Sequence, residues 1–135
     1  MTNKQRFIEV LIGNMLIGNL GMVASAAEES NYQLGLQYYR QGKYEQAISN
    51  LIEAVAENPD SLYPHYILGL SYKQVGNYEF AQTQLEKAHQ INSDHYRVMV
   101  NLGRVYLEQD KFKKAVSILN SAITADPNQD GSFNV

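Results

Sequence analysis

The sequence predicts an all-α protein, built as a solenoid of three helix-turn-helix hairpins. The main observation is a repeat, because Leu34, Leu68 and Leu102 are spaced 34 residues apart and many other positions keep the same spacing. The second is composition: 44% of the residues are hydrophobic, 19% are charged and only three are prolines. That balance is typical of a compact helical protein rather than a disordered chain.

Within the repeat, small and large side chains recur in a fixed order. The matching sets are Leu34-Gly35, Leu68-Gly69 and Leu102-Gly103; Tyr38, Tyr72 and Tyr106; Tyr44, Tyr78 and Phe112; Ala47, Ala81 and Ala115; Leu51, Leu85 and Leu119; and Ala54, Ala88 and Ala122. A small residue recurs where two helices approach closely, and a large one where a gap must be filled. Each repeat is therefore predicted to form one hairpin, with the Gly35 and Ala47 series at the contact between its helices.

Turn and capping residues set the predicted ends of the helices. Ser30 and Gln33 form a capping-box pattern, which starts the first helix near Asn31. The turn inside the hairpin falls at Gly42, Gly76 and Asp110. The second helix of each repeat is predicted to stop at Asn58-Pro59-Asp60, Asn92-Ser93-Asp94 and Asp126-Pro127-Asn128, since proline cannot continue a helix and the middle stop uses other turn residues.

Over about residues 28–129 this pattern resembles the tetratricopeptide repeat (TPR) family, with repeats at 28–61, 62–95 and 96–129. The resemblance implies a right-handed α-solenoid of three TPR hairpins that binds protein and is not an enzyme. The fourth place of each first helix, often tryptophan in the family, is Asn31, His65 or Met99 here.

A second departure concerns the end of the array. Family members commonly add a helix that covers the last repeat, but only the short tail 130–135 follows Gln129. Because terminal repeats need a polar outer face, we expect another subunit, the N-terminal segment or a partner to close that face. Truncation of a longer chain is a further alternative.

Residues 1–27 have the layout of a secretory signal peptide. Lys4 and Arg6 precede an apolar stretch at 10–23, and small residues follow it. This pattern predicts cleavage after Ala26 or Ala27 and export, with the periplasm as the expected compartment. The stretch is short for a membrane span, which needs about 20 apolar residues. An uncleaved membrane anchor and an apolar helix packed on the repeats are the alternatives.

The resemblance also implies that the first helix of each hairpin lines a concave groove. The inward positions are Tyr32, Leu36, Tyr39 and Arg40; Tyr63, Tyr66, Leu70, Lys73 and Gln74; and Arg97, Val100, Arg104, Leu107 and Glu108. Four of them are basic and one is acidic, while tyrosine offers apolar area with a hydroxyl group, as is common where proteins meet. We expect the groove to bind a protein or peptide segment with acidic and apolar residues. The alternative is that the tyrosines pack between repeats and the arginines are solvated surface.

Some family members hold the C-terminal carboxylates of chaperones in this groove, through a clamp of basic residues and asparagine. The matching positions here are Tyr32, Leu36, Ile67, Arg97 and Asn101. Only Arg97 carries the expected positive charge. A receptor for chaperone tails is therefore not expected.

Several chemistries are not expected from the composition. The chain has no cysteine, which removes disulfides, thiol nucleophiles and thiolate metal sites. Its formal net charge is -3 and its longest basic run is Lys113-Lys114, so nucleic acid is an unexpected partner.

No metal or cofactor is expected either. His65, His89 and His95 are not spaced to share a metal on one helix. The tail opens like a calcium loop, but the glutamate that should close such a loop would fall beyond Val135. The opening residues of that pattern are Asp126, Asn128, Asp130 and Gly131.

Three functions therefore compete. The first is an exported adaptor that holds a partner in its groove. The second is a structural subunit whose uncapped repeats stack into a homo-oligomer, and the third is a membrane-anchored scaffold that keeps its N-terminal segment. The fold itself names neither the partner nor the biological process.

Overall fold

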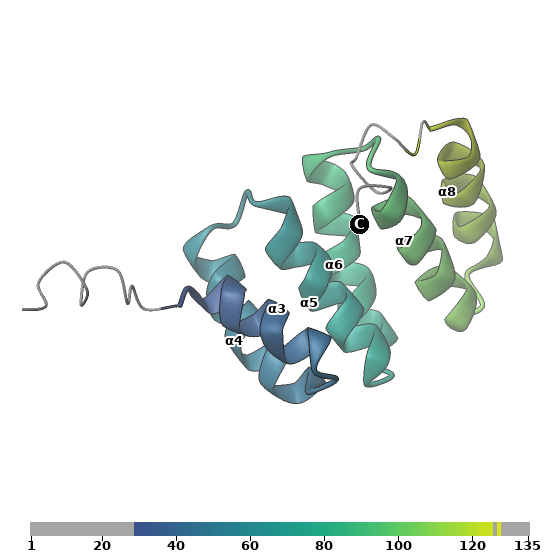
Figure 1. The fold of residues 1–135 in the computed structure, drawn as a ribbon. Helices are drawn as coiled ribbons and strands as arrows, with labels where there is room; N and C mark the ends of the chain where they lie inside the picture. The colour runs from purple at the N-terminus through teal and green to yellow at the C-terminus, as the bar shows by residue number, and fades with distance from the viewer. Residues whose placement is uncertain (1–28, 126, 128–135) are drawn as a thin grey trace, which may run out of the picture.

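The computed structural model describes residues 29–125 and 127, which form six α-helices and no strand (Figure 1). The helices pair as α3 (Asn31–Arg40) with α4 (Tyr44–Glu57), α5 (Leu62–Gln74) with α6 (Tyr78–Ile91), and α7 (Tyr96–Glu108) with α8 (Phe112–Thr124). Neighbouring hairpins pack through α4 against α5 and through α6 against α7. The helices follow one another across the molecule in chain order. The prediction of an all-α solenoid of three hairpins is confirmed.

Each hairpin closes around a glycine on its first helix. A Cβ atom added at Gly69 would lie 2.7 Å from Cγ of Leu85, which is fully buried on α6. Gly35 and Gly103 approach Leu51 and Leu119 in the same way. Such distances leave no room for a side chain, so the predicted close contact of the two helices is confirmed. On the second helices, the alanines of the Ala47 series are fully buried.

The turn inside each hairpin has the same backbone geometry. Gly42, Gly76 and Asp110 adopt positive φ angles of 73°, 78° and 57°. The amide N–H of the residue after each turn donates across it to a carbonyl of the first helix, as from Lys43 to Tyr38 at 2.9 Å. This arrangement is a Schellman motif, which satisfies the last carbonyls of the helix. Asp110 therefore takes the glycine's place in the third repeat, as predicted.

The helix ends also follow the sequence. Ser30 Oγ accepts from the amide N–H of Gln33 at 3.2 Å, and the Gln33 side chain accepts from the amide of Ser30 at 3.0 Å. The predicted capping box is thus present. α4 ends directly before Asn58-Pro59, and α6 ends at Ile91 without a proline.

His65, one of the departures from the family pattern, has a structural role. Its ring is buried, and Nε2 donates to the carbonyl oxygen of Pro59 at 2.6 Å. Nδ1 lies 2.8 Å from Oε1 of Gln84 on α6. His65 thereby ties the linker between the first two repeats to the second hairpin.

Some predictions lie outside the described residues: the signal peptide at 1–27 with its cleavage site, the tail at 130–135, and all four named residues of the calcium-like pattern. None of the helices in the described part of the chain is long and apolar enough to cross a membrane. Within that same part, no three metal-binding side chains gather into a cluster.

Candidate protein-binding groove

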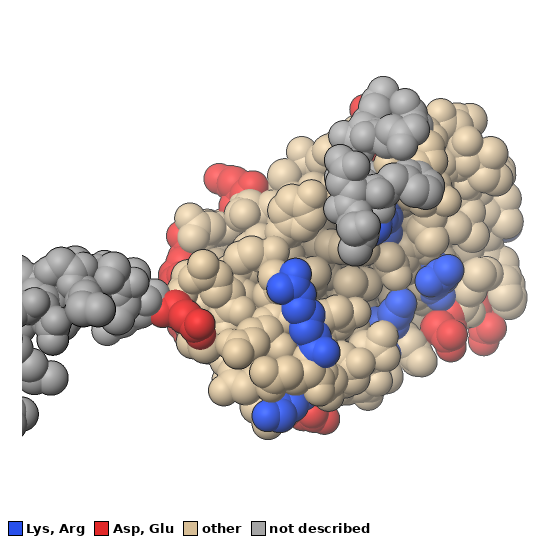
Figure 2. All heavy atoms as spheres, viewed as in Figure 1, with Lys and Arg blue, Asp and Glu red and all other residues tan. Residues whose placement is uncertain are grey.

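The candidate groove lies on α3, α5 and α7. These first helices form one layer, because α3 contacts α5 and α5 contacts α7 directly. Their predicted groove residues repeat at matching positions, so that Tyr32, Tyr66 and Val100 correspond, as do Leu36, Leu70 and Arg104. Figure 2 shows basic side chains across the middle of the face it presents, with acidic ones nearer the edges.

A hydrogen-bonded network joins the second and third repeats within this layer. Nζ of Lys73 donates to Oδ1 of Asn101 at 3.0 Å. Nδ2 of Asn101 in turn donates to Oη of Tyr66 at 3.1 Å and to the carbonyl oxygen of Arg97 at 2.9 Å. The network fixes the position of a cationic side chain between α5 and α7.

The charge of Lys73 is incompletely compensated. Burial lowers the pKa of Lys73, and the nearby positive charge of Arg104 lowers it further, while Glu108 acts in the opposite direction. Lys73 also bonds to a neutral amide, which supplies no countercharge. A negative group placed beside Lys73 and Arg104 would interact favourably with both.

Aromatic rings supply the apolar part of the groove. The Tyr63 ring is 47% exposed and lies edge-on to His95, with ring centroids 5.9 Å apart. Tyr32 and Tyr39 are half-buried, and burial raises the pKa of both phenols, so they are neutral near pH 7. Gln74 hydrogen-bonds the side chain of Tyr39, which links α3 to α5.

Most of the predicted groove residues are at least partly exposed to solvent. The exposed ones are Arg40, Tyr63, Gln74, Arg97, Arg104, Leu107 and Glu108. The half-buried ones are Tyr32, Leu36, Tyr39, Lys73 and Val100. Tyr66 and Leu70 are each only 8% exposed, since they lie on the central helix and pack in the core. For these two residues, packing between repeats describes the structure better than ligand contact.

Two residues of the site were missed by the sequence analysis. Asn101 was considered only as a clamp position, yet it connects Lys73 to Tyr66. Its signal was a polar residue at the place that Ile67 occupies one repeat earlier. His95 is buried and accepts from the amide N–H of Val98 at 3.3 Å, so it caps α7. Its ring lies next to the rings of Tyr63 and Tyr66. No sequence signal distinguished it from the other histidines.

Two sequence models of the tetratricopeptide repeat match the chain, one over residues 35–76 and the other over residues 72–132. Together they cover residues 35–132, which includes the three hairpins except the first four residues of α3. The chain carries tetratricopeptide repeats. A comparison with curated proteins finds no significant match.

Three solved structures illustrate the likeness of this TPR array to others. It is similar to the second TPR of Spaghetti (RPAP3) bound to the HSP90 peptide SRMEEVD, with 18% identity over 72% of this chain and 90% of that one, and a TM-score of 0.69. It is similar to MamA, with 27% identity over 69% of this chain and a TM-score of 0.66. It also resembles the type III secretion translocator chaperone SycD of Yersinia enterocolitica, with 22% identity over 70% of this chain and 71% of that one, and a TM-score of 0.65.

The likeness to RPAP3 and SycD shows the fold alone. The chain spans 54% of the length of the MamA chain it matches. The RPAP3 structure is a TPR domain that holds a peptide of another protein.

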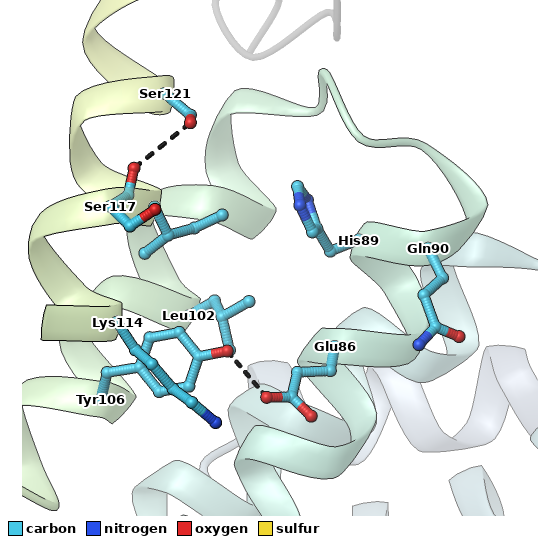
Figure 3. A pocket seen from close by; sticks show the side chains of 9 residues that line it. Glu86, His89, Gln90, Leu102, Tyr106, Lys114, Ser117 and Ser121 are labelled. Carbon is cyan, nitrogen blue, oxygen red and sulfur yellow. Dashed lines mark hydrogen bonds between the residues drawn. The ribbon is translucent and has the colours of Figure 1, made fainter. Parts of the chain in front are cut away.

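The TPR array also has a separate hollow of about 390 Å³ between α6, α7 and α8 (Figure 3). In it, Oη of Tyr106 donates to Oε1 of Glu86 at 2.7 Å, and Nζ of Lys114 lies 5.7 Å from the centroid of the Tyr106 ring. Burial raises the pKa of Tyr106, and Glu86 raises it further through the hydrogen bond and its negative charge. These contacts hold three helices together. Nδ1 of His89, on the wall of the hollow, has no hydrogen-bond partner among the described residues.

Proposed function

We propose that this protein is an interaction module whose groove binds an acidic, partly apolar segment of a partner protein. The observation that carries the proposal is the placement of Lys73, held by Asn101 and close to the charge of Arg104. A ligand carboxylate would bind beside these two cations. Exposed Tyr63 and Leu107 would contact apolar side chains of the same segment.

The peptide in the RPAP3 structure supports this ligand chemistry by analogy. Its sequence, SRMEEVD, contains two glutamates, an aspartate and the apolar residues Met and Val. In this chain the positions that match the family's clamp for a terminal carboxylate hold only one basic residue, Arg97. We therefore propose that side-chain carboxylates of the ligand, and not a free C-terminus, are recognised. Binding is the whole of the proposed mechanism, without a catalytic step or a cofactor.

Fluorescence anisotropy tests the proposal. A labelled SRMEEVD peptide and the same peptide with an amidated C-terminus should bind with equal affinity, and a version with glutamine and asparagine for the acidic residues should bind much more weakly. Arg104→Ala should weaken acidic-peptide binding, whereas the control Lys87→Ala, on exposed surface of α6, should not. Equal binding of the acidic and neutral peptides would argue against the groove chemistry.

We also propose export through residues 1–27, with the periplasm as destination and membrane retention as the alternative. Support comes from the basic, apolar and small-residue order of that segment. Mass spectrometry of the protein from an exporting host gives the test. A chain beginning at Ala27 or Glu28 supports the proposal, while an intact Met1 terminus contradicts cleavage.

Self-association is a second candidate function. The observation that favours it is the exposure of Phe112, Val116 and Ile123 on α8, at the end of the array. Three apolar side chains open to water on one helix favour contact with another protein surface. Sedimentation of the full chain tests it, since a monomer at every concentration would rule it out.

A further inference from the structure

The last helix differs from the other second helices in what covers it. α4 packs against α3 and α5, and α6 packs against α5 and α7. Among the described helices, α8 packs against α7 alone. The side of α8 that would face a following repeat therefore has no neighbour in the described part of the chain.

The exposure of matching residues on α4, α6 and α8 shows which residues form this side of α8. Phe112, Val116 and Ile123 are 59%, 58% and 80% exposed. The residues at the same repeat positions on α4 and α6 are half-buried; they are Tyr44, Ile48 and Val55, and Tyr78, Gln82 and His89. The next hairpin covers those residues in the first two repeats, so the three exposed residues belong to an equivalent seam that no described helix covers.

The spacing of the open seam suits another helix. Leu119 packs on one side against Gly103 of its own hairpin and is half-buried. With Leu119 included, the seam residues follow one another at intervals of four, three and four positions. This is the a/d pattern of helices that pack side by side with knobs in holes. We call Phe112, Val116, Leu119 and Ile123 the end stripe.

The opposite end of the array does not match the end stripe. Ile67 and Ser71 on α5 are buried, but Gln33 and Gln37, at the same repeat positions on α3, are exposed. Those positions are buried only where a preceding repeat exists, so they form the outer side of the first repeat. End-to-end stacking would press the apolar end stripe onto these polar glutamines, which is unfavourable.

We propose that a second copy of this chain covers the end stripe, through a two-fold, antiparallel contact between the two α8 helices. The inference rests on the proposed self-association and names its geometry. The stripe is symmetric about its centre, so Phe112 can face Ile123 of the second copy while Val116 faces Leu119 of the second copy. The same patch serves both subunits, as a closed two-fold dimer requires.

The charges of α8 favour the antiparallel orientation. Lys111, Lys113 and Lys114 lie at its N-terminal end, and residues 115–125 contain no charged side chain. An antiparallel pair places each lysine group beside the uncharged C-terminal half of the other helix, whose exposed carbonyls attract cations. A parallel pair would bring the two lysine groups together.

Sedimentation velocity of the full chain across a concentration series gives the first test. We expect a reversible dimer, and we expect Ile123→Glu to raise its dissociation constant by about tenfold or more, because a carboxylate would be buried in an apolar seam. Ile123 is 80% exposed in one chain, so this variant should fold normally, as circular dichroism would show. Ile52→Glu is the control, since Ile52 is 44% exposed and the matching residues on α6 and α8 are Glu86 and Asn120.

Cysteine cross-linking tests the orientation. The chain has no cysteine, so an introduced thiol is the only one present. A mixture of Phe112→Cys and Ile123→Cys chains should form a mixed disulfide, and neither variant alone should form one. Disulfides within a single variant would overturn the antiparallel arrangement.

The outcomes separate the two levels of the proposal. A chain that stays monomeric at every concentration overturns self-association as a whole. A dimer that Ile123→Glu leaves intact overturns the α8 contact alone. Loss of the dimer on deletion of residues 1–27, with no effect of Ile123→Glu, would place the dimer contact on the N-terminal segment and overturn the α8 contact.

Discussion

Lys73 on α5 and Asn101 on α7 are joined by a hydrogen bond of 3.0 Å between Nζ and Oδ1. Asn101 continues the network to the hydroxyl of Tyr66, which is itself buried. The second and third repeats therefore fix the position of the central cation of the groove through their own side chains. Such preorganisation reduces the entropy lost on binding.

Replacement of Asn101 tests this arrangement. Asn101→Asp should keep the fold but weaken binding of an acidic peptide by about tenfold, because the new carboxylate would pair with Lys73 and compete with the ligand. Fluorescence anisotropy measures the change. Asn120→Asp, on the exposed surface of α8, adds the same charge outside the groove and should have little effect. If Asn101→Asp binds the acidic peptide with unchanged affinity, Lys73 does not contribute to the binding site.

The pH dependence of binding should report on Lys73. Burial and the charge of Arg104 lower the pKa of Lys73, so its amine loses its proton at a lower pH than an ordinary lysine, whose pKa is about 10.4. The protonated amine attracts an acidic ligand. Affinity should therefore be full below the lowered pKa and fall as the pH rises through it.

Lys73→Arg provides the matched variant, because a guanidinium stays charged over this whole range. Its affinity for the acidic peptide should change little where that of the wild type falls. Anisotropy titrations at a series of alkaline pH values measure both proteins. Parallel curves for the two proteins would assign the titration to another group.

Tyr106→Phe should destabilise the fold without changing peptide binding. The substitution removes the 2.7 Å hydrogen bond to Glu86 and leaves that half-buried carboxylate without this donor. We expect the free energy of unfolding to fall by about 1.5–3 kcal/mol, the usual range for a hydrogen bond to a charged group. Urea denaturation measures it, with Tyr63→Phe as a control on an exposed ring. If the two variants are equally stable, the hydrogen bond between Tyr106 and Glu86 does not contribute to the stability of the fold.

Two glycine variants should differ in the cause of their effects. Gly69→Ala places a Cβ atom 2.7 Å from Cγ of buried Leu85, so we expect a steric loss of about 1–3 kcal/mol. At Gly76 nothing lies within 4 Å of an added Cβ, but φ is +78°. Gly76→Ala should cost about 1 kcal/mol through backbone strain alone.

Gly76→Asn separates the two causes, since asparagine tolerates positive φ better than alanine does. Thermal unfolding should rank Gly76→Asn above Gly76→Ala in stability. If Gly69→Ala melts at the wild-type temperature, the helices of the second hairpin are not in the close contact described here.

Much of the fold could be predicted because each repeat encodes its own local geometry. Ser30 and Gln33 predicted where the first helix starts. Gly42 predicted the turn after that helix, where the backbone adopts a positive φ angle. These signals act between residues close in the chain. Because the same signals recur every 34 residues, an ambiguous position could be interpreted from its equivalents. Asp110 was assigned to a turn because Gly42 and Gly76 hold the same place in the first two repeats.

The groove could be predicted less completely, because its contacts connect different repeats. Tyr32 and Tyr66 occupy the same repeat position, yet the first is half-buried and the second is buried between two neighbouring first helices. The bond between Lys73 and Asn101 spans 28 positions and depends on how α5 lies against α7. Repeat position alone gives neither the exposure of a side chain nor its partner in the next repeat.

An NMR titration would test the groove most directly. Unlabelled SRMEEVD peptide is added to ¹⁵N-labelled protein, and the backbone amide signals are followed. Binding in the groove predicts saturable shifts that centre on α5 and α7 around Lys73, Asn101 and Arg104, and that weaken in Arg104→Ala. Shifts centred instead on the hollow between α6, α7 and α8, at Glu86 and Lys114, would contradict the proposed binding site. The absence of any shift would contradict it as well.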